Sequence, residues 1–284
     1  MDNKENVVIL GSGMSILDLG KDELDYINNC KHRIAMNKFM AFYEKSKIIP
    51  NEIYFNDVYG YYVFLYIVRK CVSQNIKGLT FYIHPFLKML LYKRSYVKNF
   101  FSDLWFRLLA MGKIILKLNV DCDFHRFILF RKFEYIRISD DYNLVSLRLN
   151  NWLKGGQWAN DFKSELFHFR GSLTTCINVA SIIEPGADVL LVGNDFNGSE
   201  YFYEKELNES GVKWKDYTFD QIKKAGVHYS FQNVNGHTME EKFPFILREL
   251  QKRGMGLYCL NKDSLLVTKA NVPYLNLKEY LRHS

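Results

Sequence analysis

The hydrophobic residues of the chain fall mostly in short runs separated by polar stretches. Four of these runs are typical of buried parallel strands, because a strand covered on both faces needs no polar side. They lie at residues 7–10, 33–36, 53–55 and 189–192. Residues 79–83 and 257–260 are further candidates. The pattern therefore predicts a parallel sheet of short buried strands.

Helical patterns lie between these runs, most clearly at residues 173–183 and 239–253. Strands that alternate with helices are typical of an α/β fold with a doubly wound parallel sheet, of the Rossmann-like kind. In such folds a ligand binds outside the carboxyl ends of the strands. We therefore look for functional residues directly after each predicted strand.

Two segments do not fit this alternation. Residues 86–118 are long, aromatic and basic, which suits either an interfacial membrane helix or a core helical pair with a basic outer face. Residues 197–236 are polar and contain Gly198, Gly211 and Gly226. We predict that 197–236 form a mobile lid inserted into a core made of residues 1–196 and 237–284.

Composition narrows the classes of protein. A hydrophobic content of 48% predicts a globular fold, and a net charge of +7 suits anionic partners. The five cysteines show no CxxC pair, which is typical of a reducing compartment without structural zinc. We see neither a signal peptide nor an apolar stretch long enough to span a membrane, so we expect a cytoplasmic protein. Whether it forms a homo-oligomer is left open.

The first predicted strand runs into the loop Gly11-Ser12-Gly13. Glycines at this place let the backbone approach a phosphate or ribose, although a tight strand-to-helix turn would need them too. Ile16 stands where a dinucleotide fingerprint has its third glycine, and the next strand ends in Asn37 rather than an acidic residue. Both features disfavour NAD.

Two later strands also end in asparagine, at Asn37-Lys38 and Asn56-Asp57. An asparagine side chain can donate and accept hydrogen bonds to a base or ribose, but it also commonly begins a turn. Further on, Arg170-Gly171-Ser172 precede the predicted helix at 173–183. Ser172 or Thr174 could cap that helix, whose N-terminus would then bind a carboxylate.

Taken together, these motifs resemble the bacterial sialyltransferases of glycosyltransferase family 42. The resemblance rests on ILGSGMS, AMNKF with YFND, RGSLTT…LLVGNDF, and NGHT followed by a helix and GLYCLNKDSLL. It implies a Rossmann-like core of the GT-A variant type, a lid over the donor, and a CMP-activated nonulosonic acid as donor. It also implies transfer to a glycan or lipid-linked glycan with inversion, with neither a metal nor a cofactor. Lipopolysaccharide or capsule biosynthesis, with peripheral contact on the inner face of the plasma membrane, is the expected setting.

The resemblance also implies roles for particular residues. His237 would be the general base, Arg170 would support the site, and Tyr201 or Tyr203 would donate to the leaving phosphate. The remaining positions would form the donor site: Gly11, Ser12, Gly13, Asn37, Lys38, Asn56, Ser172, Leu173, Gly193, Asp195 and Asn197.

Several residues depart from the family pattern. Ser12 and Asn197 stand where the family usually has Asn and Tyr, and Lys38 stands where it has Gln. The loop between His228 and His237 is longer than usual, so His228 is an alternative base. These departures leave the sugar open, and Kdo, legionaminic acid or pseudaminic acid remain candidates.

Other functions compete with this interpretation. Asp121-Cys122-Asp123 matches the DxD pattern by which many glycosyltransferases bind a metal and nucleotide, although so short a motif recurs by chance. Flagellin nonulosonic acid transferases of the motor-accessory type share a similar glycine loop. A nucleic-acid-binding module would suit the charge, but no RNP, helix-turn-helix or KH pattern occurs, so we expect no nucleic-acid partner.

Overall fold

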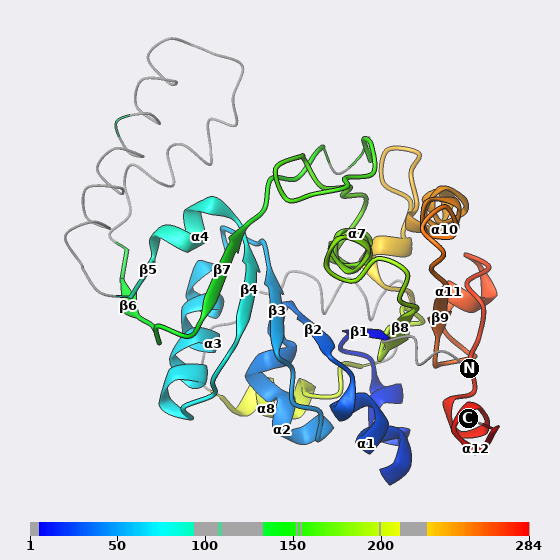
Figure 1. Ribbon diagram of the computed structural model, residues 1–284, viewed down its shortest axis with the longest axis horizontal. Helices are drawn as coiled ribbons and strands as arrows, with labels where there is room; N and C mark the ends of the chain where they lie inside the picture. The colour runs from blue at the N-terminus through cyan, green and yellow to red at the C-terminus, as the bar shows by residue number, and fades with distance from the viewer. Residues whose placement is uncertain are drawn as a thin grey trace.

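A seven-stranded parallel sheet forms the centre of the protein (Figure 1). The computed structural model describes residues 6–93, 108, 133–151, 153, 155–198, 200–210 and 226–283. The strand order is β7-β4-β3-β2-β1-β8-β9, and every pairing is parallel. The strands are β1 (Val7–Leu10), β2 (His32–Met36), β3 (Glu52–Phe55), β4 (Thr80–Ile83), β7 (Asn143–Ser146), β8 (Val189–Val192) and β9 (Leu257–Cys259). A separate pair joins β5 (Leu91–Tyr92) to β6 (Ile136–Arg137).

Helices cover both faces of this sheet (Figure 1). One face carries α1 (Lys21–Asn29), α2 (Tyr43–Ser46), α3 (Tyr61–Ser73) and α8 (Glu204–Glu209). The other carries α7 (Ser172–Ile183) and α10 (Phe243–Gln251). The shorter helices are α4 (Pro85–Met89), α11 (Leu265–Thr268) and α12 (Leu277–His283), with 3-10 turns η1 (Met14–Asp18), η2 (Asn37–Phe42), η3 (Tyr229–Phe231) and η4 (Met239–Lys242).

The core is correspondingly split into two layers. Successive side chains of a strand point to opposite faces, so Val8 and Leu10 pack with α1 and α3, whereas Val7 and Ile9 pack with α7 and α10. All four are fully buried. The doubly wound Rossmann-like fold that the sequence predicts is therefore confirmed.

The six predicted strands all occur in the sheet, whereas β5, β6 and β7 were not predicted and the last predicted helix differs. Strand β7 was not predicted, because it lies at the sheet edge, where its residues Asn143–Ser146 are only partly buried and need no apolar run. The helix predicted at 239–253 is divided into η4 and α10. Pro244 stands in the first turn of α10, where its missing N–H does no harm, whereas inside a longer helix it would remove a hydrogen bond.

The basic segment 86–118 is described only in part. Its first residues form α4 and β5, and Leu108 is exposed. The remainder lies outside the described residues, as do Asp121 and Asp123 of the DxD motif, so membrane contact and the metal motif stay predictions. No helix in the described part of the chain combines the length and apolar character needed to cross a membrane.

The predicted lid, residues 197–236, is also described in part. Its described residues include α8 and η3 but no strand of the seven-stranded sheet. Phe202, Tyr203 and Leu207 are buried in the layer that contains α1 and α3, so this first part of the segment packs directly on the core. The division into core and lid stays a prediction.

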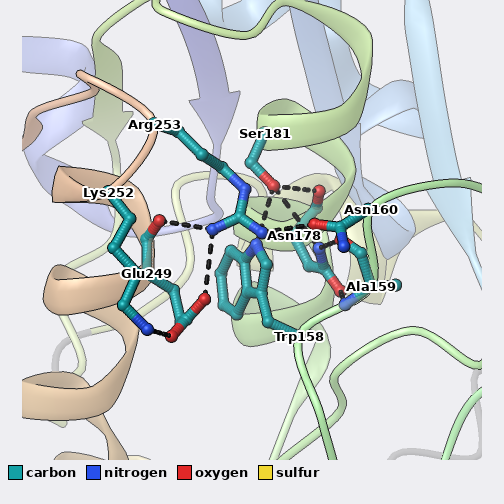
Figure 2. A network of polar contacts seen from close by, with 8 residues as sticks. All are labelled: Trp158, Ala159, Asn160, Asn178, Ser181, Glu249, Lys252 and Arg253. Atoms are coloured by element: carbon teal, nitrogen blue, oxygen red, sulfur yellow. Dashed lines mark hydrogen bonds and ion pairs between the residues drawn. The ribbon is translucent and has the colours of Figure 1, made fainter.

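A polar network fixes the chain just before Arg170 (Figure 2). The Trp158 indole N–H donates to Ser181 Oγ at 3.0 Å. Buried Asn178 accepts from the Ala159 N–H at 3.2 Å and donates to the Ala159 carbonyl at 2.9 Å. Arg253 of the turn after α10 donates to Asn160 Oδ1 at 2.5 Å. Residues 158–160, which precede Arg170 in the chain, are thereby bound to α7 and to the turn after α10.

A cluster of charged side chains at the amino ends of β2 and β3 predicts that the free energy of unfolding depends on pH. His32 lies 2.6 Å from Glu52 and 3.1 Å from Glu184, and Lys31 lies 2.7 Å from Glu184. The hydrogen bond to Glu52, followed by the Glu184 contacts, raises the pKa of His32. A raised folded-state pKa stabilises the fold below the unfolded-state value of about 6.5, and the contribution is lost as pH rises through the folded-state pKa.

We therefore expect His32→Gln to lower the free energy of unfolding more at about pH 6 than at about pH 9. Denaturant unfolding of both proteins at the two pH values measures this difference. Glu184, whose pKa is lowered mainly by Lys31, has the opposite dependence and loses its contribution only in acid. An equal effect of His32→Gln at both pH values would contradict the prediction.

Candidate functional site

A cavity with a volume of about 900 Å³ lies at the carboxyl ends of the central strands. The loops after β1, β2, β3 and β8 all line it. Successive strands β2, β3 and β4 extend to one side of β1, whereas β8 and β9 extend to the other. The cavity thus occupies the point where the strand order reverses, which is the usual ligand site of such sheets.

Two glycines after β1 allow the loops that follow β1 and β8 to touch. The Gly11 N–H donates to the Val192 carbonyl at 2.8 Å, and the Gly13 N–H to the Gly193 carbonyl at 2.7 Å. A Cβ on Gly11 would lie 2.3 Å from the Gly193 carbonyl oxygen, and one on Gly13 would lie 2.3 Å from the Asp195 carboxylate. Both positions therefore require glycine, and Ser12 between them is brought to the cavity wall.

Asp195 holds this loop in place. Its carboxylate accepts from the Ser15 N–H at 3.0 Å, from Ser15 Oγ at 2.5 Å and from Asn261 Nδ2 at 2.8 Å. Asp195 lines the cavity, but these three bonds direct its oxygens to the protein. Asp195 is therefore a buried support for the glycine loop. Through its bonds to Ser15 and Asn261 it joins the loops after β1, β8 and β9.

The N-terminus of α7 forms a second wall. Asn37 adopts a left-handed backbone conformation (φ 53°), which asparagine tolerates, and its Nδ2 donates to Ser172 Oγ at 3.2 Å. Gly171 is the N-cap of α7 and no side chain caps the helix, so the prediction that Ser172 or Thr174 is the cap is wrong. Thr174 Oγ1 instead accepts from the Phe169 N–H at 2.9 Å. Gly171, Ser172 and Leu173 line the cavity, where the positive end of the helix dipole favours an anion.

The loops after β2 and β3 add a cation and an acceptor. Lys38 lines the cavity, where burial lowers its pKa to about 8 despite the nearby Asp57 carboxylate. Asp57 Oδ1 accepts from the N–H groups of Tyr59 and Gly60, each at 3.0 Å, just before α3. Asn56 Oδ1 is buried and has no hydrogen-bond partner among the described residues. This carbonyl oxygen is suited to accept from a ligand amino group.

Tyr201 and Tyr203 lie directly against the glycine loop. The Phe202 N–H donates to the Ser12 carbonyl at 3.0 Å, and the Tyr203 hydroxyl donates to Ser12 Oγ at 3.1 Å. The two tyrosine rings stack with centroids 5.6 Å apart. Burial raises the pKa of Tyr201 to about 12 and that of Tyr203 further. Both phenols therefore stay protonated and able to donate near neutral pH.

Arg170 supports the opposite side of the cavity. It is 1% exposed, and its Nη2 donates to the carbonyls of Tyr229 and Gln232 at 2.9 and 2.7 Å. Its guanidinium also lies 4.9 Å from the centre of the Tyr229 ring. Arg170 therefore fastens residues 229–232, near the end of the predicted lid, to the loop that precedes α7.

Two of the predicted site residues lie away from the cavity lining. Asn197 is exposed. The His237 side chain is 41% exposed, and its Nδ1 lies 2.8 Å from Glu241 Oε1. Its ring packs edge-on against Phe169 at 6.0 Å, next to Arg170 in the chain. Thr238 is the N-cap of η4 but makes no side-chain capping bond. The other predicted site residues all line the cavity.

Sequence reasoning missed several residues of the cavity wall, among them Tyr54 and His168. Tyr54 lies two residues before Asn56, and the two-residue period of a strand could have indicated that both share a face. His168 bonds Thr175 Oγ1 through Nδ1 at 2.8 Å, and burial lowers its pKa to about 4. No sequence pattern pointed to His168, because it lies in an irregular stretch between β7 and α7.

Among solved structures, this chain is similar to the sialyltransferase CstII from Campylobacter jejuni, solved in complex with a substrate analogue, CMP-3FNeuAc. The sequences are 16% identical, the TM-score is 0.36, and the alignment covers 95% of this chain and 86% of that chain. No protein-family model matches the sequence, and no curated protein does so.

Proposed function

We propose that this protein is a glycosyltransferase that moves a nonulosonic acid, such as sialic acid, from a CMP-activated donor to a glycan hydroxyl. The observation that carries the proposal is the cavity at the strand-order reversal, which combines a glycine loop, an uncapped helix N-terminus and two protonated tyrosines. Such a donor carries two anionic groups, a phosphate and a carboxylate. The cavity provides more than one place suited to an anion.

The donor can be placed group by group. Ser12 and Gly13, with Tyr201 and Tyr203 beside them, form the phosphate site. The N-terminus of α7 at Ser172 binds the carboxylate of the sugar. Lys38 adds a positive charge to the same cavity and, with Asn37, contacts the sugar. Asn56 accepts from the amino group of the cytosine base.

The reaction is a displacement at the anomeric carbon. An acceptor hydroxyl oxygen forms a bond to that carbon as the bond to the phosphate oxygen breaks, and CMP leaves with the electron pair. The proton of the acceptor hydroxyl passes to His237 as general base. Glu241, 2.8 Å from Nδ1, would hold the Nδ1 proton and leave the Nε2 lone pair available, as carboxylates orient histidine bases elsewhere.

Nucleotide preference tests the donor assignment. We expect CMP to bind more tightly than UMP by about 1–3 kcal/mol, because uracil presents a carbonyl where cytosine presents the amino donor that Asn56 needs. Thermal shifts with CMP, UMP, GMP and ADP rank the ligands, and calorimetry gives the affinities. Asn56→Asp keeps an acceptor and should keep the preference, whereas Asn56→Leu should remove it. Equal affinities for CMP and UMP in the wild type would contradict the assignment.

Transfer is expected to survive metal chelation. The phosphate charge that develops on the leaving group is met by the hydroxyl of Tyr201 or Tyr203 and by a helix N-terminus, which can stabilise it without a cation. Initial rates with CMP-sialic acid, measured with and without EDTA, should agree. Loss of turnover in EDTA and recovery with manganese would instead point to Asp121 and Asp123 as metal ligands.

A further inference from the structure

His228 stands at the cavity wall beside one of the two tyrosines of the phosphate site. Its ring packs edge-on against Phe196 with centroids 5.0 Å apart, and its backbone N–H donates to the Phe196 carbonyl at 3.0 Å. Nε2 of the ring lies 3.2 Å from the Tyr201 hydroxyl oxygen. His228, near the end of the predicted lid, is thereby connected to Tyr201.

The hydrogen bonds around the ring determine where its proton lies. Nδ1 accepts from the Ser230 backbone N–H at 3.2 Å, so Nδ1 carries no proton. Burial lowers the pKa of His228 to about 4, so the ring is neutral near pH 7 and holds one proton. That proton must therefore be on Nε2, from which it is donated to the Tyr201 hydroxyl oxygen.

This assignment restricts the Tyr201 hydroxyl. The hydroxyl oxygen already accepts from His228, so its own proton cannot be directed back to the histidine. The Tyr203 ring stacks on the Tyr201 ring, and the Tyr203 hydroxyl donates to Ser12 Oγ. Tyr201 pairs with Gly13 through an antiparallel bridge and lines the cavity together with the Glu204 carboxylate. The Tyr201 proton is therefore directed away from His228, and an oxygen of a ligand bound in the cavity that Tyr201 lines can accept it.

We propose that His228 is a positioning residue that donates its Nε2 proton to Tyr201 and so directs the Tyr201 hydroxyl proton to the leaving phosphate of the donor. The proposal rests on the proposed function for the identity of that phosphate. It also excludes His228 as the general base, because Nδ1 is occupied by a backbone N–H and Nε2 already carries the proton. Of the two candidate bases, His237 is the one left.

The orientation of His228 can be measured without any substrate. Ring ¹⁵N NMR of the unliganded full-length protein distinguishes the protonated from the unprotonated nitrogen of each histidine, and His228→Gln identifies the signals. We expect the Nε2–H tautomer, unchanged between about pH 6 and pH 8. Tyr201→Phe should shift the Nε2 signal and leave the Nδ1 signal nearly unchanged. An Nδ1–H tautomer, or a ring that titrates in this range, would overturn the proposal.

Activity then tests the coupling. Tyr201→Phe removes the donor itself and should lower kcat by about 100-fold. His228→Leu should also lower kcat, and the double variant His228→Leu/Tyr201→Phe should be no slower than Tyr201→Phe alone, since both act through one hydroxyl. His228→Gln retains an N–H near the Nε2 position and should be faster than His228→Leu. Melting temperature and CMP affinity of each variant separate loss of fold from loss of rate.

The results have distinct meanings. If the losses in kcat of the two single variants multiply in the double variant, His228 acts independently of Tyr201 and the proposal is overturned. The same holds if the pH profile of kcat for His228→Gln no longer shows a basic group. If the wild type transfers no nonulosonic acid and binds no CMP, the proposed function is wrong, and the NMR measurement alone decides the orientation of His228 and Tyr201.

Discussion

His237→Ala is expected to lower kcat for transfer by about 10²–10⁴-fold, the usual contribution of a general base. CMP affinity should stay close to that of the wild type, because the His237 side chain is 41% exposed and does not line the cavity. Initial rates with CMP-sialic acid and a glycan acceptor measure the first effect, and calorimetry with CMP measures the second.

Glu241→Gln is the matched variant. Its effect should be in the same direction but smaller, because the amide can still accept a hydrogen bond from Nδ1 but no longer carries the negative charge. His237 does not line the cavity, so it must move toward the cavity to act as the base. We therefore expect residues 233–238 to move when the acceptor binds. An active His237→Ala enzyme would contradict the assignment.

Gly11→Ala is expected to lower the free energy of unfolding by about 3 kcal/mol, the upper end of overpacking costs, and to weaken CMP binding by about 100-fold. The new Cβ would lie 2.3 Å from the Gly193 carbonyl oxygen, so the loops after β1 and β8 must separate. The glycine loop would then be displaced from Tyr203 and from Asp195. Denaturant unfolding and calorimetry with CMP measure the two effects.

Gly20→Ala serves as the control for this substitution. A Cβ there would meet only the flexible end of Glu23 at 3.3 Å, and Gly20 lies outside the cavity. We expect its stability to change by less than about 1 kcal/mol and its CMP affinity to be that of the wild type. If Gly11→Ala behaves as Gly20→Ala does, the close contact between the two loops is not a feature of the protein in solution.

Much of the fold could be predicted because local pattern and burial agree in its centre. Strands β1, β2, β3 and β8 are buried over most of their length, so each appears in the sequence as a short apolar run. The residue after each such run lies at the same edge of the sheet whenever the strands are parallel. This is why Gly11, Asn37 and Asn56 could be grouped at one edge from their positions along the chain alone, whereas Gly193 came from the resemblance to the family.

Edge elements and irregular segments do not follow this rule. Strand β7 is only partly buried, so its sequence resembles that of a loop. His168 reaches the cavity through the network around Trp158 and Asn178, which joins residues that are far apart in the sequence. Such contacts depend on how two helices and an irregular segment pack, and a pattern of neighbouring residues contains no information about that packing.

The amino-acid sequence by itself therefore determined the class of fold and the edge of the sheet that holds the candidate site, because both follow from the periodicity of buried strands. Most of the predicted site residues came instead from the resemblance of the motifs to a family, and they are only part of the cavity wall. Only the tertiary structure decided the positions of the two candidate histidines. His228 and His237 are nine positions apart in one loop region, and both were open as bases from the sequence. In our proposal, the bond from the Ser230 N–H to Nδ1 and the contact with Tyr201 give His228 the wrong tautomer for a base, while Glu241 orients His237. A proton's place on an imidazole is decided by the partners around the ring, and those partners are brought together only by folding.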